Sequence, residues 1–193
     1  MAIPSDWFIA IAIGIGLAAA TGFRVFLPLL IAGVAARWGG LPLADGFNWL
    51  SSNSALLALG TASVVEVAAY YIPLVDHVLD LVAGPAAVLA GVLASASAMA
   101  DVPPGIMWPV AVIAGGGIAG LTKTISALVR AKSGWVTAGL ANPIVSTGET
   151  AGAIVTAIAA IVFPLISLAG LVTLLFWLGR RARRMWTSSS VRL

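Results

Sequence analysis

Six apolar stretches, each long enough to cross a lipid bilayer as a helix, constrain the fold of this chain more than any other feature. A crossing needs about 20 apolar residues. The stretches lie at about 7–36, 54–73, 77–99, 107–130, 143–162 and 164–180. Only 9% of the residues are charged, whereas a typical soluble domain has about 25%. The sequence therefore predicts an all-α, polytopic membrane helical bundle of about six transmembrane spans, forming a single domain over 1–193.

The two halves of the chain each contain one cation followed by a Ser-x-x-Glu motif, inside otherwise apolar sequence. These residues are Arg24, Ser63 and Glu66 in the first half, and Lys123, Ser146 and Glu149 in the second. Many transporters are built from duplicated membrane units. Because a unit of three spans crosses the membrane an odd number of times, we expect two inverted repeats, at about 7–100 and 107–180.

Both glutamates are expected to face the interior of the bundle, because a charge exposed to lipid is costly. Each lies on the same helix face as the serine three residues before it. The similarity of the halves makes Arg24 and Lys123 the expected partners, in either combination. One interpretation is a polar centre in which Glu66 and Glu149 bind protons or cations and the two cations contact anions. The alternative is a pair of internal salt bridges that only fix the helix packing.

The path to such a centre is expected to be lined by Ser63, Ser146 and the break at Asn142-Pro143. The segments 37–54 and 133–143 are rich in Gly, Trp and Ser and fall at matching places in the two halves. They are either interfacial loops with Trp anchors or re-entrant elements whose backbone lines a site. Pro28 is expected to kink the long first span.

A second polar cluster, Asp76, His77 and Asp80, stands at the start of the third span and has no counterpart in the second half. Its carboxylates would bind a cation or assist catalysis. Alternatively, these acidic residues stabilise the positive end of a helix dipole at the surface. The chain has no cysteine and one histidine, so we expect no metal centre and no cofactor. The glycine-rich stretches at 14–16 and 115–120 are expected to allow close helix packing.

Basic residues are concentrated at two places, and this distribution predicts the orientation. Arg130 and Lys132 flank the connection after the fourth span, and a basic tail occupies 180–193. The positive-inside rule then puts both termini in the cytosol, in a multi-pass protein of the inner (plasma) membrane. The expected partners are the lipid bilayer and an unknown small ion or metabolite, and no nucleic acid. A homodimer is left open.

Three segments resemble an uncharacterised bacterial integral-membrane family, DUF4126, which is defined as a domain of unknown function. They are Arg24-x-Phe-Leu-Pro28, Glu66…Pro73-x-x-Asp76-x-x-x-Asp80 and Asn142-Pro143-x-x-Ser146-x-x-Glu149. The resemblance covers about 7–178. It implies a membrane location and a compact helical bundle, and it implies no activity. The family pattern often has an acidic residue after the second Glu, where this chain has Thr150.

The function expected from these features is that of a small secondary transporter or permease-like membrane protein with paired intramembrane carboxylates. One alternative is a non-transporting membrane scaffold or accessory subunit. Another is an intramembrane enzyme that acts on a lipid-linked substrate through Asp76, His77 and Asp80. No nucleophile–base pair is visible in the sequence, so we do not expect an enzyme.

Overall fold

The part of the chain that the computed structural model describes is built from helices and contains no strand. The description covers residues 5–72, 75–137 and 141–189, without the side chains of 75–78, 80–81, 135–136, 178–179 and 181–189. The elements are α1 (Ser5–Thr21), α2 (Leu27–Trp38), the 3-10 helix η1 (Asn48–Ser51), α3 (Asn53–Ala69), α4 (Val75–Ser97), α5 (Pro104–Val110), the π-helical segment η2 (Ala111–Gly116), α6 (Gly117–Thr137), α7 (Asn142–Val162) and α8 (Pro164–Ser189). The all-α prediction is confirmed.

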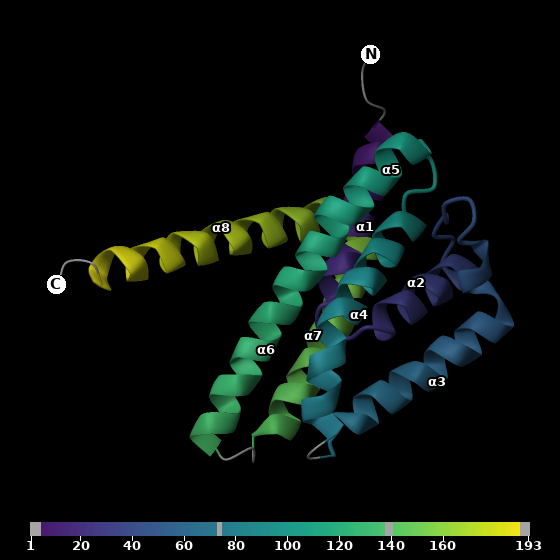
Figure 1. Ribbon diagram of the computed structural model, residues 1–193. Coiled ribbons are helices and arrows are strands. Elements are labelled where there is room, and N and C mark those ends of the chain that lie inside the picture. Colours follow the sequence, from purple (N-terminus) through teal and green to yellow (C-terminus); the bar gives the residue numbers. More distant parts are fainter. Residues whose placement is uncertain (1–4, 73–74, 138–140, 190–193) are drawn as a thin grey trace.

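The predicted first span, 7–36, is two helices rather than one. α1 ends at Thr21 and α2 begins at Leu27, and in Figure 1 α2 leaves the end of α1 in a different direction. Pro28 lies in the first turn of α2, where its missing N–H is tolerated. It therefore starts a helix, and the expected kink is replaced by a full break at 22–26. We call α1, this break and α2 the α1–α2 hairpin, and residues 22–26 its tip.

One end of the bundle is defined by a buried apolar cluster around Phe47. The cluster joins the loop after α2 to the end of α4 and the start of α5, through Leu50, Met99 and Met107, and the start of α1 packs against it through Trp7. A backbone hydrogen bond supports the same arrangement, because the N–H of Ala44 donates to the carbonyl oxygen of Ser97 at 2.9 Å. We call this the Phe47 end.

At the opposite end, which we call the Tyr70 end, α3 and α6 end, and α4 and α7 begin (Figure 1). The start of α1 lies at the Phe47 end, whereas the sequence predicts the N-terminus on the same side as the end of α3 and the end of α6. The reason is the chain reversal at 22–26, which brings the chain back toward the Phe47 end before α3 begins.

The other predicted spans correspond to helices. Segments 54–73, 77–99, 107–130, 143–162 and 164–180 match α3, α4, the continuous rod α5–η2–α6, α7 and α8. Of the segment 133–143, the described residues are mostly helical, because α6 continues to Thr137 and α7 begins at Asn142. The segment 37–54 is a loop at the Phe47 end, in which Gly40 and Gly46 adopt positive φ angles of 73° and 86°. The described chain reverses direction at 22–26, between α1 and α2.

Small residues bring the helices into close contact, as the glycine stretches predict. A Cβ on Gly14 would lie 2.6 Å from the carbonyl oxygen of Ser95, and a Cβ on Gly115 would lie 2.9 Å from the hydroxyl of the same serine. α1 and η2 therefore both pack directly on α4. In contrast, α8 projects away from the bundle (Figure 1) and packs on α1 near Ser167.

Candidate functional site

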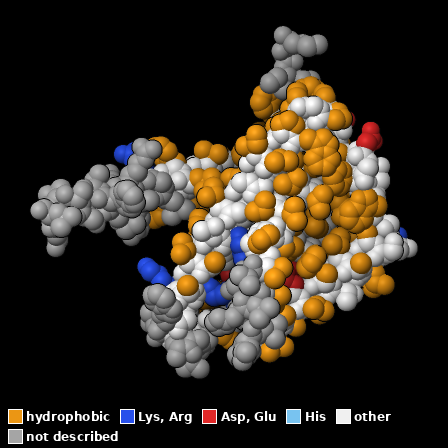
Figure 2. All heavy atoms as spheres, in the orientation of Figure 1, with side chains coloured by type: hydrophobic (Ala, Val, Ile, Leu, Met, Phe, Trp, Pro, Cys, Tyr) orange, Lys and Arg blue, Asp and Glu red, His pale blue; other side chains and the backbone are white. Residues whose placement is uncertain are grey.

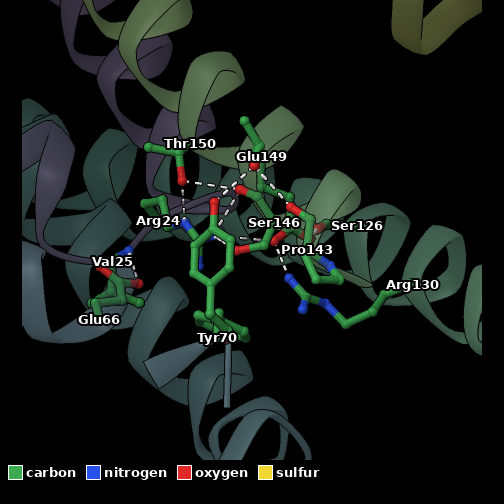
Figure 3. A network of polar contacts seen from close by, with 12 residues as sticks. Arg24, Val25, Glu66, Tyr70, Ser126, Arg130, Pro143, Ser146, Glu149 and Thr150 are labelled. Carbon is green, nitrogen blue, oxygen red and sulfur yellow. Dashed lines mark hydrogen bonds and ion pairs between the residues drawn. The ribbon is translucent and has the colours of Figure 1, made fainter. Parts of the chain in front are cut away.

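The α1–α2 hairpin carries Arg24 into the interior, and its side chain is fully buried, with 0% exposure. The tip faces α3, α6 and α7 near the Tyr70 end. The contacts fall in the last turn of α3, at Glu66, and in the second turn of α7, at Glu149. The group of polar residues around Arg24, which we call the polar centre, therefore lies one to two helical turns inside this end of the bundle. Figure 3 shows the side chains of these elements converging there.

Arg24 is held mainly by the start of α7. Its Nη2 donates to the carbonyl oxygen of Ser146 at 2.9 Å and to the hydroxyl of the same serine at 2.6 Å, and its Nε donates to the hydroxyl of Thr150 at 3.1 Å. The Nη1 atom is buried and has no hydrogen-bond partner among the described residues. A guanidinium carries five N–H donors, so Arg24 retains donor capacity inside the protein.

Glu66, which belongs to α3, caps the N-terminus of α2. Its Oε1 accepts from the backbone N–H of Val25 at 2.7 Å and its Oε2 from that of Phe26 at 3.1 Å (Figure 3). Phe26 is the N-cap of α2, and no side-chain hydrogen bond caps that helix locally. A carboxylate at a helix N-terminus also interacts favourably with the helix dipole. The direct hydrogen-bond partners of Glu66 are therefore backbone amides, and not the cation expected from the sequence.

Glu149 has side-chain partners instead. Its Oε1 accepts from the hydroxyl of Ser126, and its Oε2 accepts from Nη2 of Arg130, both from α6. Nη2 of Arg24 lies 3.7 Å from the same Oε2. Arg24, one of the two cations expected as partners, therefore lies within ion-pair distance of Glu149, although Arg130 makes the closer contact.

Three cations surround the ring of Tyr70, which is buried at the end of α3. The guanidinium carbons of Arg24 and Arg130 lie 4.4 and 4.5 Å from the ring centroid, and Nζ of Lys123 lies 5.4 Å away. Lys123 also donates to the Tyr70 hydroxyl at 3.3 Å. Cation–π attraction strengthens when the groups are shielded from water, so the ring holds together charges that would otherwise repel.

Some of the predicted site residues meet at the hairpin tip, and others lie apart from it or outside the described part of the chain. Those that meet at the hairpin tip are Arg24, Glu66, Lys123, Ser146 and Glu149. Ser63 is buried one turn before Glu66 on α3, and its hydroxyl has no hydrogen-bond partner among the described residues. Asn142 begins α7 and is half-buried. The side chains of Asp76, His77 and Asp80 lie outside the described part of the chain, so that cluster stays a prediction.

Four residues of the centre were not singled out from the sequence: Tyr70, Ser126, Arg130 and Thr150. A helical-face argument would have found two of them on α6, since Ser126 and Arg130 stand three and seven residues after Lys123 and share its face. Tyr70 similarly stands four residues after Glu66. Thr150 carries no such signal, because its contact depends on where the hairpin tip lies.

The polar centre holds one buried donor without a hydrogen-bond partner among the described residues, Nη1 of Arg24, and two carboxylates whose oxygens already accept hydrogen bonds. It has no set of ligands for a metal, because no three His, Cys, Asp or Glu side chains converge within the ranges that the structure describes. What the arrangement offers is a buried cation with spare donor capacity next to a carboxylate held by α6.

The matching family model covers residues 11–184, which is most of the chain. The chain belongs to the DUF4126 family. The family description is "Domain of unknown function (DUF4126)", so membership in DUF4126 adds no activity to the site. No curated protein and no solved structure matches the chain.

Proposed function

We propose that this protein is a small integral-membrane transporter whose substrate site lies at the tip of the α1–α2 hairpin. The observation that carries the proposal is the break of an apolar segment around a fully buried Arg24. Discontinuous helices that meet inside a bundle form the substrate sites of many secondary transporters, and non-helical backbone at membrane depth is tolerated where it lines such a site. The substrate class is a small ion or polar metabolite.

The surface supports a membrane setting. Two described helices, Pro104–Gly134 and Asn142–Val162, are long and apolar enough to cross a bilayer, and five further apolar helices are shorter. Large apolar side chains are exposed on most helices; among the most exposed, each above 70%, are Leu57, Ile113, Ile144 and Ile166. Figure 2 shows many apolar side chains on the surface in view, over the part of it that is not grey. Soluble monomers rarely expose contiguous apolar patches beyond a few hundred Å².

The topology proposed here is one re-entrant hairpin, α1–α2, and five crossings: α3, α4, the α5–η2–α6 rod, α7 and α8. With Arg130 and Lys132 in the cytosol, the positive-inside rule puts the Tyr70 end inside. The N-terminus is then outside and the basic tail inside. The inverted relation is proposed for the motif helices only, since α3 runs toward the Tyr70 end and α7 runs away from it. α1 and α6 both run toward that end.

In this proposal the two glutamates have different roles. Glu149, next to Arg24 and Arg130, takes part in binding the substrate or its coupling proton. Glu66 holds the hairpin tip through Val25 and Phe26. Access from the two sides would alternate as the hairpin moves relative to α6 and α7, because the tip carries Arg24 and contacts both helices.

A second candidate function is a scaffold in which these charges only fix the fold. The observation in its favour is that both oxygens of each glutamate already have partners inside the protein. Removing one partner from such a set is strongly destabilising in any bundle, so stability alone does not separate the two functions. Flux does.

Flux into liposomes tests the proposal. Purified protein would be reconstituted with an imposed proton gradient and a panel of small ions and metabolites. We expect gradient-driven flux of at least one solute with the wild type, and loss of that flux with Glu149→Gln that is folded by circular dichroism and size-exclusion chromatography. Asp101→Asn, the same chemical change at an exposed residue, should retain flux. Flux no greater than that of protein-free liposomes, with every solute of the panel, would favour the scaffold. Equal gradient-driven flux in wild type and Glu149→Gln would remove Glu149 from the transport path.

A further inference from the structure

A crevice opens between α6 and α7 and reaches Glu149 from the side of the bundle. Its volume is about 270 Å³, and its walls are mostly apolar. The lining residues are Phe23, Ile125, Ser126, Val129, Val145, Gly148 and Glu149. Phe23 belongs to the hairpin tip, so this crevice joins the tip, the carboxylate and the outer surface of the bundle. None of the roles proposed above uses its apolar walls.

The polar side chains among the lining residues are Glu149 and Ser126. The hydroxyl of Ser126 donates its proton to Oε1 of Glu149, so the oxygens of both side chains are acceptors. A carboxylate offers about four lone-pair positions, and Ser126 and Arg130 occupy two of them. A ligand that donates one hydrogen bond therefore has an acceptor at the inner end of the crevice.

The charged side chains at the inner end of the crevice determine which class of ligand fits there. Arg130 contacts Glu149 directly and Arg24 lies 3.7 Å from it, so two cations oppose an incoming ammonium group. The Glu149 carboxylate opposes an incoming carboxylate or phosphate. A neutral hydroxyl donates to the acceptor without either repulsion and with a smaller desolvation penalty than a charged group.

The size and walls of the crevice select the rest of the ligand. Pockets for drug-sized molecules have about 300–1,000 Å³, so this crevice holds one end of a molecule. Ile125, Val129 and Val145 form apolar walls that suit a methylene chain leading out to the surface. We propose that the crevice binds a neutral long-chain alcohol, with its hydroxyl against Glu149 and Ser126 and its chain along these walls.

This inference rests on the membrane setting of the proposed function but not on transport. Photocrosslinking tests it, with the protein in nanodiscs of phosphatidylcholine and hexadecanol carrying a diazirine close to the hydroxyl. Adducts would be mapped by mass spectrometry. We expect adducts on crevice residues, removed by excess unlabelled hexadecanol, and at least fivefold weaker with hexadecanoate or hexadecylammonium probes of the same design.

Two matched glycine variants provide the control. A Cβ at Gly148 or at Gly170 would meet nothing within 4 Å, so both positions have room for a larger side chain. Gly148→Phe fills the crevice and should abolish its adducts, whereas Gly170→Phe on α8 should leave them unchanged. Adducts spread evenly over exposed apolar faces, or equal in Gly148→Phe and wild type, would overturn the inference. So would stronger labelling by either charged probe. Crevice labelling without flux would keep this inference and remove the transport proposal.

Discussion

Glu66 accepts hydrogen bonds from two backbone amides, whereas Glu149 accepts from a serine and an arginine side chain. The difference matters because the backbone N–H groups at a helix start have no acceptor within their own helix that could replace the carboxylate. Glu66 is therefore a fixed part of the fold, tied to the first residues before α2. Glu149 is surrounded by side chains that can rearrange around a ligand.

Glu66→Gln is expected to destabilise the protein. The amide presents one oxygen instead of two, so either Val25 or Phe26 loses the acceptor for its N–H in a buried site. Leaving one such donor unsatisfied costs about 1–3 kcal/mol. Thermal unfolding in detergent, followed by circular dichroism, would show a lower midpoint for Glu66→Gln. Asp101→Asn should melt with the wild type. An unchanged midpoint for Glu66→Gln would mean that the hairpin tip is not held by this carboxylate.

At the scale of the elements, five helical segments follow directly from the sequence, because apolar stretches of crossing length leave few alternatives to helix. The break at 22–26 does not follow in the same way. Apolar sequence continues on both sides of Arg24, and the single charge and Pro28 are compatible with one kinked helix. What ends α1 is a tertiary contact: the tip packs on α6, and Glu66 supplies the cap for α2.

The candidate site, too, could be predicted from the sequence only in part. Its motif residues could be predicted from the repeated cation and Ser-x-x-Glu pattern, and most of them do meet at the tip. The partners of Glu149 could not be predicted, since the sequence places Arg130 beside a connection between spans. α6 continues past it to Thr137, which keeps Arg130 inside the bundle at 5% exposure. The position at which α6 ends, and not the residue type, therefore determines that Arg130 pairs with Glu149.

Gly22 tests the packing of the hairpin tip. A Cβ there would lie 2.7 Å from the carbonyl oxygen of Ala119 and 2.9 Å from the backbone nitrogen of Lys123. Because both are backbone atoms of α6, they cannot move aside cheaply, and Gly22→Ala should destabilise by about 1–3 kcal/mol, as overpacking does. Gly60→Ala in α3 adds a methyl group with nothing within 4 Å. It should be neutral or stabilising by up to about 1 kcal/mol. Chemical denaturation in mixed micelles measures both, and equal midpoints would show that the tip does not pack closely on α6.

At the scale of the whole molecule, the proposed topology depends on the hairpin, which would set the number of crossings and the side on which the chain begins. A single span over 7–36 would put residue 6 on the side opposite to residue 45. A re-entrant hairpin would put both on the same side, because the start of α1 and the loop after α2 meet in the cluster around Phe47. The connection after α6 lies at the other end in either case. The position of residue 6 therefore distinguishes the two topologies.

The chain has no cysteine, so single-cysteine variants report topology without a background. Asp6→Cys, Asp45→Cys and Lys132→Cys replace side chains that are all exposed. With a membrane-impermeant maleimide on intact cells, we expect Asp6→Cys and Asp45→Cys to react from outside, and Lys132→Cys to react only after permeabilisation. Labelling of Asp6→Cys together with Lys132→Cys would instead mean that 7–36 crosses the membrane. In that case Arg24 would lie within a continuous span, and the proposal that the hairpin tip is the moving element of a transporter would be overturned.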